Sequence, residues 1–178
     1  MRGSTAIINK HIKQTAAKIS MVYFHAIVKI AKSLGGEVRS FNGDAMLVFF
    51  PGISRTSIST AVKAAMQIKY VLADAPNAVN TLLDKYTPVD FGIGVDFGSI
   101  LCTKVGIAGE NNHDLVWIGN AVNKAAKLCD TRSLPNAIAI SEQAYNNLNT
   151  EVKIHALQTT WGPTPIDMWN SDIFLYNQ

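Results

Sequence analysis

The sequence predicts an α/β fold in which helices flank a mixed β-sheet. Segments with apolar residues at helical spacing alternate with short apolar runs of strand character, and one pair of runs is joined by an Asn-Gly turn. Hydrophobic residues make up 48% of the 178 residues and charged residues 16%, which is typical of a globular chain. The length favours a single domain over residues 1–178.

The first predicted element is a helix that runs from Thr5 to Leu34. Ser4 and Thr5 can cap its first turn, and Gly35-Gly36 ends it. Its apolar face recurs at helical spacing through Ile19, Val22, Ala26, Ile27, Ile30 and Leu34.

A hairpin and a second helix follow. The strand-like runs 37–41 and 45–50 flank Asn42-Gly43, which is the strongest hairpin signal in the chain. The second helix is predicted over residues 57–72, with one apolar face formed by Ile58, Ala61, Val62, Ala65, Ile68 and Leu72.

The second half of the chain contains further strands and a prominent helix. Strands are predicted over 89–95 and 99–107, joined near Asp96-Phe97-Gly98, and over 115–118. A helix over 119–130 is expected to bury Val122, Ala125, Ala126 and Cys129. A strand over 137–140 and a short helix capped by Ser141 come next, and the tail from Glu151 is predicted to hold one or two strands.

Charge and cysteine usage exclude several classes of function. The net charge is only +3 and the basic residues are scattered, so a nucleic-acid groove is not indicated, although an anionic small substrate suits the charge. Cys102 and Cys129 have no CxxC spacing and the four histidines have no metal-ligand spacing. No apolar run reaches the roughly 20 residues of a membrane span, so a cytoplasmic protein is expected.

Three segments carry residues suited to chemistry. Arg2, Gly3, Ser4 and Thr5 stand at the start of a helix, where backbone N–H groups can bind phosphate oxygens, although an ordinary N-cap explains them equally well. Asp44 follows the hairpin turn, where a carboxylate is either exposed to solvent or bound to a cation.

The third segment runs from Val116 to Lys127. Asn123 and Lys127 are four residues apart and project from one helix face, where an amide and a cation could hold a ribose and a developing phosphate charge. A solvated helix face is the alternative for this pair.

In this order and separation, the segments resemble the class III adenylate and guanylate cyclases. The matching stretches are Met1-Arg2-Gly3-Ser4-Thr5, Gly35 to Asp44, Gly94-Val95-Asp96-Phe97-Gly98 and Gly119 to Lys127. The resemblance covers about residues 1–145 and implies the class III cyclase fold, a mixed sheet around a ferredoxin-like βαββαβ core. The family's first strand and first metal aspartate would precede Met1. Either the start of the sequence is truncated, which is the better expectation because a sheet without its central strand should fold badly, or the chain lacks one metal ligand.

The resemblance also implies a mechanism. Two divalent ions, Mn²⁺ or Mg²⁺, would activate the ribose hydroxyl and clamp the triphosphate, with Asp44 as a metal ligand. Asn123 would orient the ribose, and Lys127 stands where the family has an arginine that stabilises charge on phosphorus. Arg2, Gly3, Ser4, Thr5 and Gly43 would contact the nucleotide. The family's active sites lie at a homodimer interface, so a homodimer is expected.

The choice of base is where the chain departs from the family. Ser40 and Val116 replace the polar groups that read purines, so poor discrimination in favour of a purine is expected. Together with Arg39 and Trp117 they would shape the base pocket. The segment from Val116 to Leu128 is similar to the pyrimidine cyclases of the bacterial Pycsar antiphage system, whose cyclic UMP or cyclic CMP activates a separate effector protein.

This similarity predicts UTP, ahead of CTP, as the substrate. An adenylate or guanylate cyclase with an unusual pocket is one alternative. A catalytically inactive domain that binds nucleotide or dimerises is the other.

Overall fold

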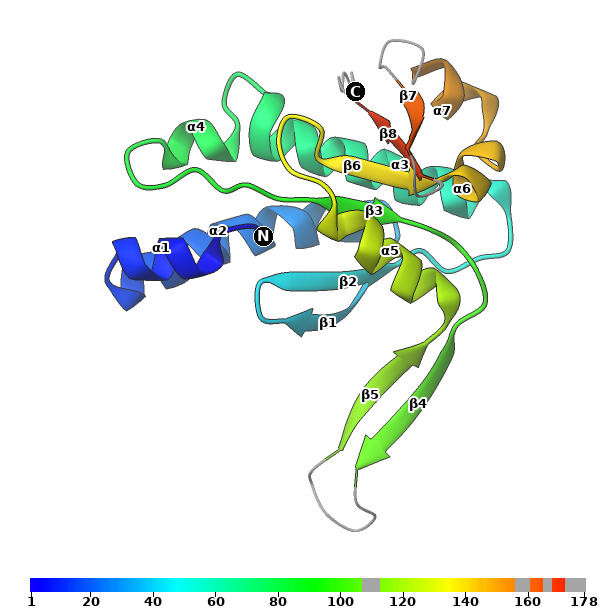
Figure 1. Cartoon of the computed structure of the whole chain (residues 1–178), viewed down its shortest axis with the longest axis horizontal. Coiled ribbons are helices and arrows are strands. Elements are labelled where there is room, and N and C mark those ends of the chain that lie inside the picture. The colour runs from blue at the N-terminus through cyan, green and yellow to red at the C-terminus, as the bar shows by residue number, and fades with distance from the viewer. Residues whose placement is uncertain (107–112, 156–160, 165–167, 172–178) are drawn as a thin grey trace.

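A computed structural model describes residues 1–106, 113–155, 161–164 and 168–171. Two helices open the chain, α1 (Ser4–Lys10) and α2 (Lys13–Ser33) (Figure 1). The sequence predicted one continuous helix, but extended backbone at His11 and Ile12 divides it. The predicted caps at the start of the helix, Ser4 and Thr5, were also wrong. Gly3 caps α1 with a φ of 65°, and no side chain bonds to the helix start because Ser4 already lies in the first turn.

The predicted hairpin is confirmed as β1 (Glu37–Asn42) and β2 (Ala45–Phe49), which pair antiparallel. Asn42 lies opposite Ala45, and Gly43 turns the chain with a φ of 60°. The register shifts between Val38 and Ser40, so Arg39 is the extra residue of a β-bulge. A bulge bends its strand and changes where the bulged side chain points.

The second predicted helix is confirmed as α3 (Arg55–Lys69), which continues as a π-helix, η1 (Tyr70–Asp74). Its N-cap is Ser54, whose hydroxyl accepts a hydrogen bond from the Ser57 amide at 3.4 Å. The buried Lys69 ammonium donates to the Asp74 carboxylate at 2.7 Å. A short helix, α4 (Val79–Leu83), follows and was not predicted, because five residues are too few to show a helical period.

The principal sheet has four strands in the order β3-β6-β8-β7. β3 (Ile93–Val95) pairs parallel with β6 (Ile138–Ser141), and β8 (Met168–Ser171) pairs antiparallel with β6 and with β7 (Trp161–Thr164). The mixed sheet that the sequence predicted is therefore confirmed, and the tail, where one or two strands were expected, holds two among its described residues.

Two short helices follow β6, namely α6 (Glu142–Asn146) and α7 (Thr150–His155). Ser141 caps α6 as predicted, because its hydroxyl accepts from the Ala144 amide at 3.1 Å. α7 was not predicted.

A second antiparallel hairpin is formed by β4 (Leu101–Gly106) and β5 (His113–Ile118). Figure 1 shows this hairpin, called the arm below, extending away from the body of the molecule. The strands expected on either side of Asp96–Gly98 both exist, but they belong to different sheets. The arm carries exposed apolar side chains: Leu101, Val105, Leu115, Val116 and Ile118.

The core has two main clusters. One joins α1 and α2 to Leu72, Leu83 and Phe91, and the other packs α3 against β6 and the helices that follow it. This arrangement places helices against the sheet, as the sequence predicted. No helix within the described residues is both long and apolar enough to cross a membrane.

The first two residues lie between two parts of the fold. The amino group of Met1 donates to the Asp44 carbonyl at 2.7 Å, just ahead of β2. The Arg2 amide donates to the Asp90 carbonyl at 2.6 Å, in the segment that leads to β3. The predicted absence of a family strand ahead of Met1 stays a prediction.

Candidate active site

Asn123 and Lys127 project from the helix α5 (Asn120–Asp130), as their spacing predicted. Both side chains are exposed, and neither has a hydrogen-bond or ion-pair partner among the described residues. An amide and an ammonium one turn apart are thus available to a ligand. The predicted buried face was only partly right: Ala126 is exposed, whereas Val122, Ala125 and Cys129 are half-buried. The buried residues of α5 are Ala121 and Leu128.

α5 lies directly on β3 because two glycines allow the backbones to approach. A Cβ at Gly94 would overlap the Ala125 carbonyl, and one at Gly92 would overlap the Cys129 carbonyl. The Cys129 thiol donates to the Gly92 carbonyl at 3.2 Å, and burial raises the pKa of that thiol. This close contact therefore fixes the distance between the sheet and the helix that carries Asn123 and Lys127.

The side chain of Arg2 lies at the C-terminal end of α5, although the residue itself directly precedes the N-cap of α1. Its Nε donates to the Arg132 carbonyl at 3.0 Å and its Nη2 to the Cys129 carbonyl at 2.5 Å. The other residues predicted to bind phosphate are Gly3, Ser4 and Thr5, at the start of α1, where Ser4 is half-buried and Gly3 and Thr5 are exposed.

Asp44 occupies the turn between β1 and β2, next to Gly43, as predicted. Its residue is half-buried, and its carboxylate has no hydrogen-bond partner among the described residues. No group of three or more His, Cys, Asp or Glu side chains that could enclose a metal exists in the part of the chain that is described. A cation at Asp44 would therefore need oxygen atoms from substrate or water.

Arg39 and Trp117 lie together, although they come from β1 and β5. The Arg39 guanidinium stacks over the Trp117 ring, 5.5 Å from its centroid, and also pairs with Glu37. The Phe49 ring meets the Trp117 ring edge-on, with centroids 4.9 Å apart. Trp117 Nε1 is buried and has no partner among the described residues.

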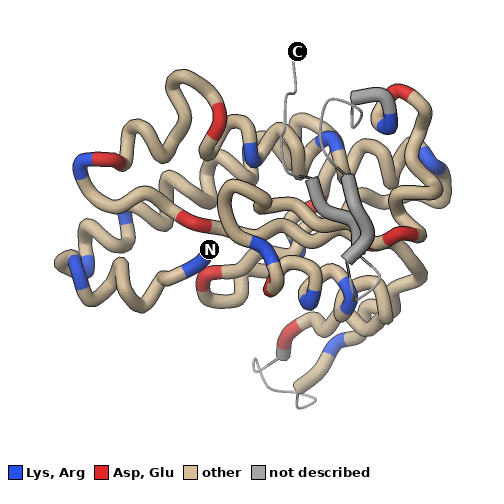
Figure 2. Tube along the Cα trace, turned by 45° about the horizontal axis from the view of Figure 1, so that its top comes forward, with Lys and Arg blue, Asp and Glu red and all other residues tan. Residues whose placement is uncertain are grey.

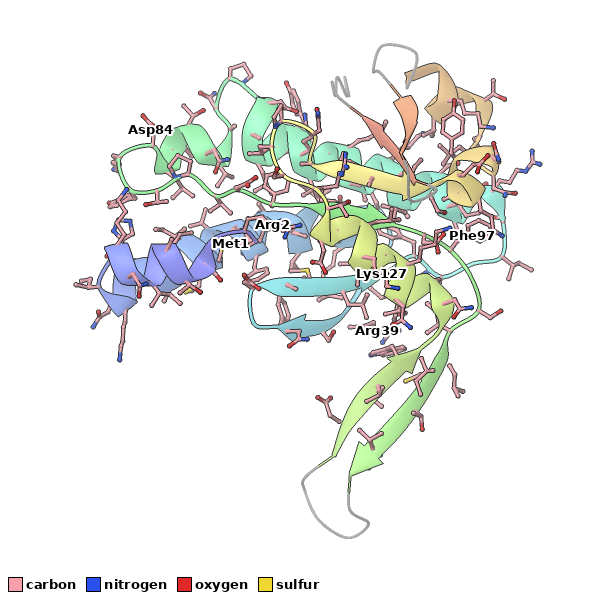
Figure 3. All side chains as sticks on the ribbon, in the orientation of Figure 1. Met1, Arg2, Arg39, Asp84, Phe97 and Lys127 are labelled. Carbon is pink, nitrogen blue, oxygen red and sulfur yellow. The ribbon has the colours of Figure 1, made fainter. Side chains whose placement is uncertain are left out.

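The other two residues of the predicted base pocket lie beside this pair. Ser40 is half-buried and follows the bulged Arg39, and Val116 is 38% exposed on the arm. Figure 3 shows Arg39 and Lys127 in the same region, where α5, the β1–β2 hairpin and the base of the arm meet. The contact of Arg39 with Trp117 joins β1 to β5, and β5 leads directly into the helix α5 that carries Asn123 and Lys127.

Two neighbours of this place were missed by sequence reasoning. Phe49 packs on Trp117, and Glu37 pairs with Arg39. The two charges at positions 37 and 39 could have suggested the ion pair, since alternate residues of a strand share a face. Nothing in the sequence pairs Phe49 with Trp117.

A surface hollow of about 540 Å³ lies elsewhere, between α2 and η1. It is apolar and contains none of the predicted site residues; its lining is Met21, Val22, His25, Ala26, Lys29, Ile30, Val71 and Val79. Figure 2 shows basic and acidic positions interspersed over several elements and not gathered in one stripe.

Known proteins are similar to this chain in sequence and in fold. The profile of the adenylate and guanylate cyclase catalytic domain matches residues 2–162. A uridylate cyclase from Xanthomonas perforans is 31% identical over 95% of this chain and 71% of its own length. A uridylate cyclase from Burkholderia cepacia is 29% identical over 90% of this chain and 68% of its own length.

Among solved structures, the guanylyl cyclase Cya2 superposes with a TM-score of 0.74 at 19% identity. The match covers 96% of this chain and 87% of that one. At this identity the likeness concerns the fold, and it confirms the predicted fold class.

Proposed function

Because the chain belongs to the adenylate and guanylate cyclase catalytic domain family, we propose that it cyclises a pyrimidine nucleoside triphosphate. UTP, in preference to CTP, would give the 3′,5′-cyclic monophosphate and pyrophosphate. The observation that carries this proposal is the Arg39–Trp117 pair beside α5, at the positions expected to read the base. The likeness to uridylate cyclases supports the same substrate class.

The guanidinium donors of Arg39, beside Trp117, favour uracil over cytosine. A guanidinium donates hydrogen bonds but cannot accept them. Uracil presents a carbonyl oxygen at the position where cytosine presents an amino group. An amino group facing these donors would have no acceptor, and an unpaired polar group in a closed site is costly.

Purines are disfavoured by what stands at two neighbouring positions. Val116 offers no hydrogen-bonding side chain, and Ser40 offers only a short hydroxyl. A site that lacks partners for a purine's edge gains little from the larger base.

Class III cyclases use divalent metal ions, and Asp44 is the described residue that we expect to hold them. Asp44 supplies one carboxylate, and Mg²⁺ is commonly bound through one or two carboxylates together with substrate phosphates. When bound, such an ion polarises the phosphate and the attacking hydroxyl. The number of ions and the choice of Mn²⁺ or Mg²⁺ stay predictions.

The remaining catalytic roles would belong to two residues of α5. Asn123 would hold the ribose through its amide, and Lys127 would place its ammonium beside the phosphorus, where negative charge builds up in the transition state. Both side chains are free to do this, because neither has a partner among the described residues. A lysine supplies charge there but not the two-pronged contact of the family's arginine.

We also propose that two copies of the chain form the active sites together. Apolar side chains of the arm are left exposed, among them Leu101 at 63% and Leu115 at 49%. Clustered exposed apolar residues are typical of protein interfaces. A second copy would cover them and would bring Asp44 of one protomer to α5 of the other. On the resemblance to the antiphage cyclases, we propose that the product is a messenger that activates a separate effector protein.

One assay tests the substrate. The chain is incubated with Mn²⁺ and with UTP, CTP, ATP or GTP in parallel, and cyclic products are identified by mass spectrometry. Cyclic UMP as the main product supports the proposal. A cyclic purine as the main product would refute the base argument built on Arg39 and Val116, and no product from any nucleotide would favour an inactive binding or dimerisation domain.

A further inference from the structure

The side chain of Arg2 is hydrogen-bonded at the C-terminal end of the helix that carries Lys127. Its Nε and Nη2 donate to the carbonyls of Arg132 and Cys129, at 3.0 and 2.5 Å. We propose that Arg2 is a positioning residue, which anchors the C-terminal end of α5 and thereby sets the place of Lys127. Its effect on turnover rests on the proposed cyclase function, but the anchor itself does not.

The acceptors explain why an arginine suits this position. The last carbonyls of a helix have no partner within the helix and carry a partial negative charge. The Cys129 carbonyl already accepts the Arg132 amide at 3.1 Å, and the guanidinium supplies a second donor to it. A guanidinium can bind two carbonyls at once because its donors form a rigid fork.

Arg2 is itself held at its backbone by the segment that leads to β3. Its amide donates to the Asp90 carbonyl at 2.6 Å. The Asp90 carboxylate accepts the amides of Phe91 and Leu134, each at 2.8 Å. The chain just beyond α5 is therefore tied to the same residue that holds the backbone of Arg2.

The same helix end is also confined by the segment that leads to β3. Gly92 approaches the Cys129 and Arg132 carbonyls, which are the acceptors of Arg2, so closely that a Cβ there would overlap the Cys129 carbonyl. This glycine and the Arg2 guanidinium thus meet the end of α5 at the same carbonyl groups. Lys127 belongs to the last turn of α5, and Asn123 stands one turn earlier. Without the anchor the last turn can fray, and Lys127 is displaced first.

The two carbonyls engage the Nε–H and one N–H of Nη2, which is one of the two forks of the guanidinium. A phosphate would have to bind through the N–H groups that remain on Nη1 and Nη2. The nucleotide-binding role expected for Arg2 and the positioning role therefore make different predictions.

The test compares Arg2→Ala, Arg2→Lys and Lys10→Ala in the full chain. Lys10 is a matched control, since it is a basic residue of α1 whose ammonium donates to a backbone carbonyl, that of Tyr86, at 3.3 Å. Hydrogen–deuterium exchange of residues 125–134 is followed without nucleotide, and kcat and KM are measured for UTP with Mn²⁺.

Positioning predicts faster exchange over residues 125–134 in Arg2→Ala, an intermediate rate in Arg2→Lys and no change in Lys10→Ala. It also predicts that Arg2→Ala lowers kcat by roughly 10- to 100-fold, because small misplacements of a catalytic group have effects of this size. KM should stay within about twofold, and Arg2→Lys should recover part of kcat.

Unchanged exchange would overturn the proposal, whatever happens to the rates. So would a raised KM with an unchanged kcat, which is the signature of a lost ground-state contact with phosphate. Failure of the proposed function looks different, because the wild-type chain would then make no cyclic product while the difference in exchange remained.

Discussion

The guanidinium of Arg39 stacks on the ring of Trp117, although the two residues are 78 positions apart and belong to separate hairpins. Arg39 is the extra residue of the β-bulge in β1, so the bulge lies at the contact between the two hairpins. Glu37 pairs with the same guanidinium, and Phe49 supports the ring from β2. The donors are thus held in place before any nucleotide binds.

Removal of the Arg39 donors should reduce the preference for uracil over cytosine. Arg39→Met keeps a chain of similar length but cannot donate, so kcat/KM for UTP should fall roughly tenfold, the value of one good hydrogen bond. The value for CTP should change by less than about twofold. Lys32→Met, at an exposed position in the last turn of α2, serves as the control. Equal losses for the two nucleotides would show that Arg39 does not read the base.

Asp44→Asn should abolish the metal-dependent reaction while leaving the fold intact. The substitution keeps the size of the side chain and removes the charge that binds a divalent cation. We expect a loss of at least about 100-fold in kcat, as for other groups that stabilise the transition state. Mn²⁺ binding, followed by electron paramagnetic resonance in the presence of UTP, should weaken in parallel. Asp84→Asn, an exposed carboxylate beyond α4, should leave both measurements unchanged, and full Mn²⁺ affinity in Asp44→Asn would contradict the assignment.

The features that the sequence predicts are those determined by residues close together along the chain. The β1–β2 turn at Gly43 and the Ser141 cap were predicted because a few adjacent residues determine them. The helical face of Asn123 and Lys127 followed from spacing alone.

Other features depend on contacts between distant segments and left no local pattern. The anchoring of Arg2 on Cys129 spans 127 positions, and the sequence alone suggested a phosphate contact instead. The helical period of α5 was predicted correctly, but the buried face was placed too far round the helix, so Ala126 was expected in the core. The face that approaches the sheet depends on Gly92 and Gly94, which lie far from α5 in the sequence.

Two inactive variants should restore activity when they are mixed, if each site takes residues from both protomers. Asp44→Ala and Lys127→Ala are each expected to be inactive as homodimers. A mixed dimer contains one site with both defects and one site with neither, so random exchange should restore about a quarter of wild-type activity. The measurement is UTP turnover after the variants are unfolded together and refolded. No recovery would mean that Asp44 and Lys127 act within one chain.

Charges on the arm should separate the two copies. Leu115→Asp places a carboxylate on a side chain that is 49% exposed and that we expect at the interface. Burying an unpaired charge is costly, so the variant should be monomeric by light scattering and inactive. Leu82→Asp is matched in chemistry and lies on α4, at 65% exposure. It should keep the wild-type mass, and a dimer that persists in Leu115→Asp would place the interface elsewhere.

The thiol of Cys129 should make the fold less stable in alkali. Burial raises its pKa above the ordinary value of 9.0, so above pH 9 the unfolded chain loses this proton more readily than the folded chain. Stability is therefore unaffected below pH 9 and falls as the pH rises further, by up to about 1 kcal/mol at pH 10 for this partly exposed group. Urea unfolding at pH 8 and pH 10 measures the difference. In Cys129→Ala the decrease should be smaller, even though the variant loses the bond to Gly92. Cys102 is exposed, so Cys102→Ala should retain the full decrease, and identical decreases in all three proteins would show that Cys129 does not cause it.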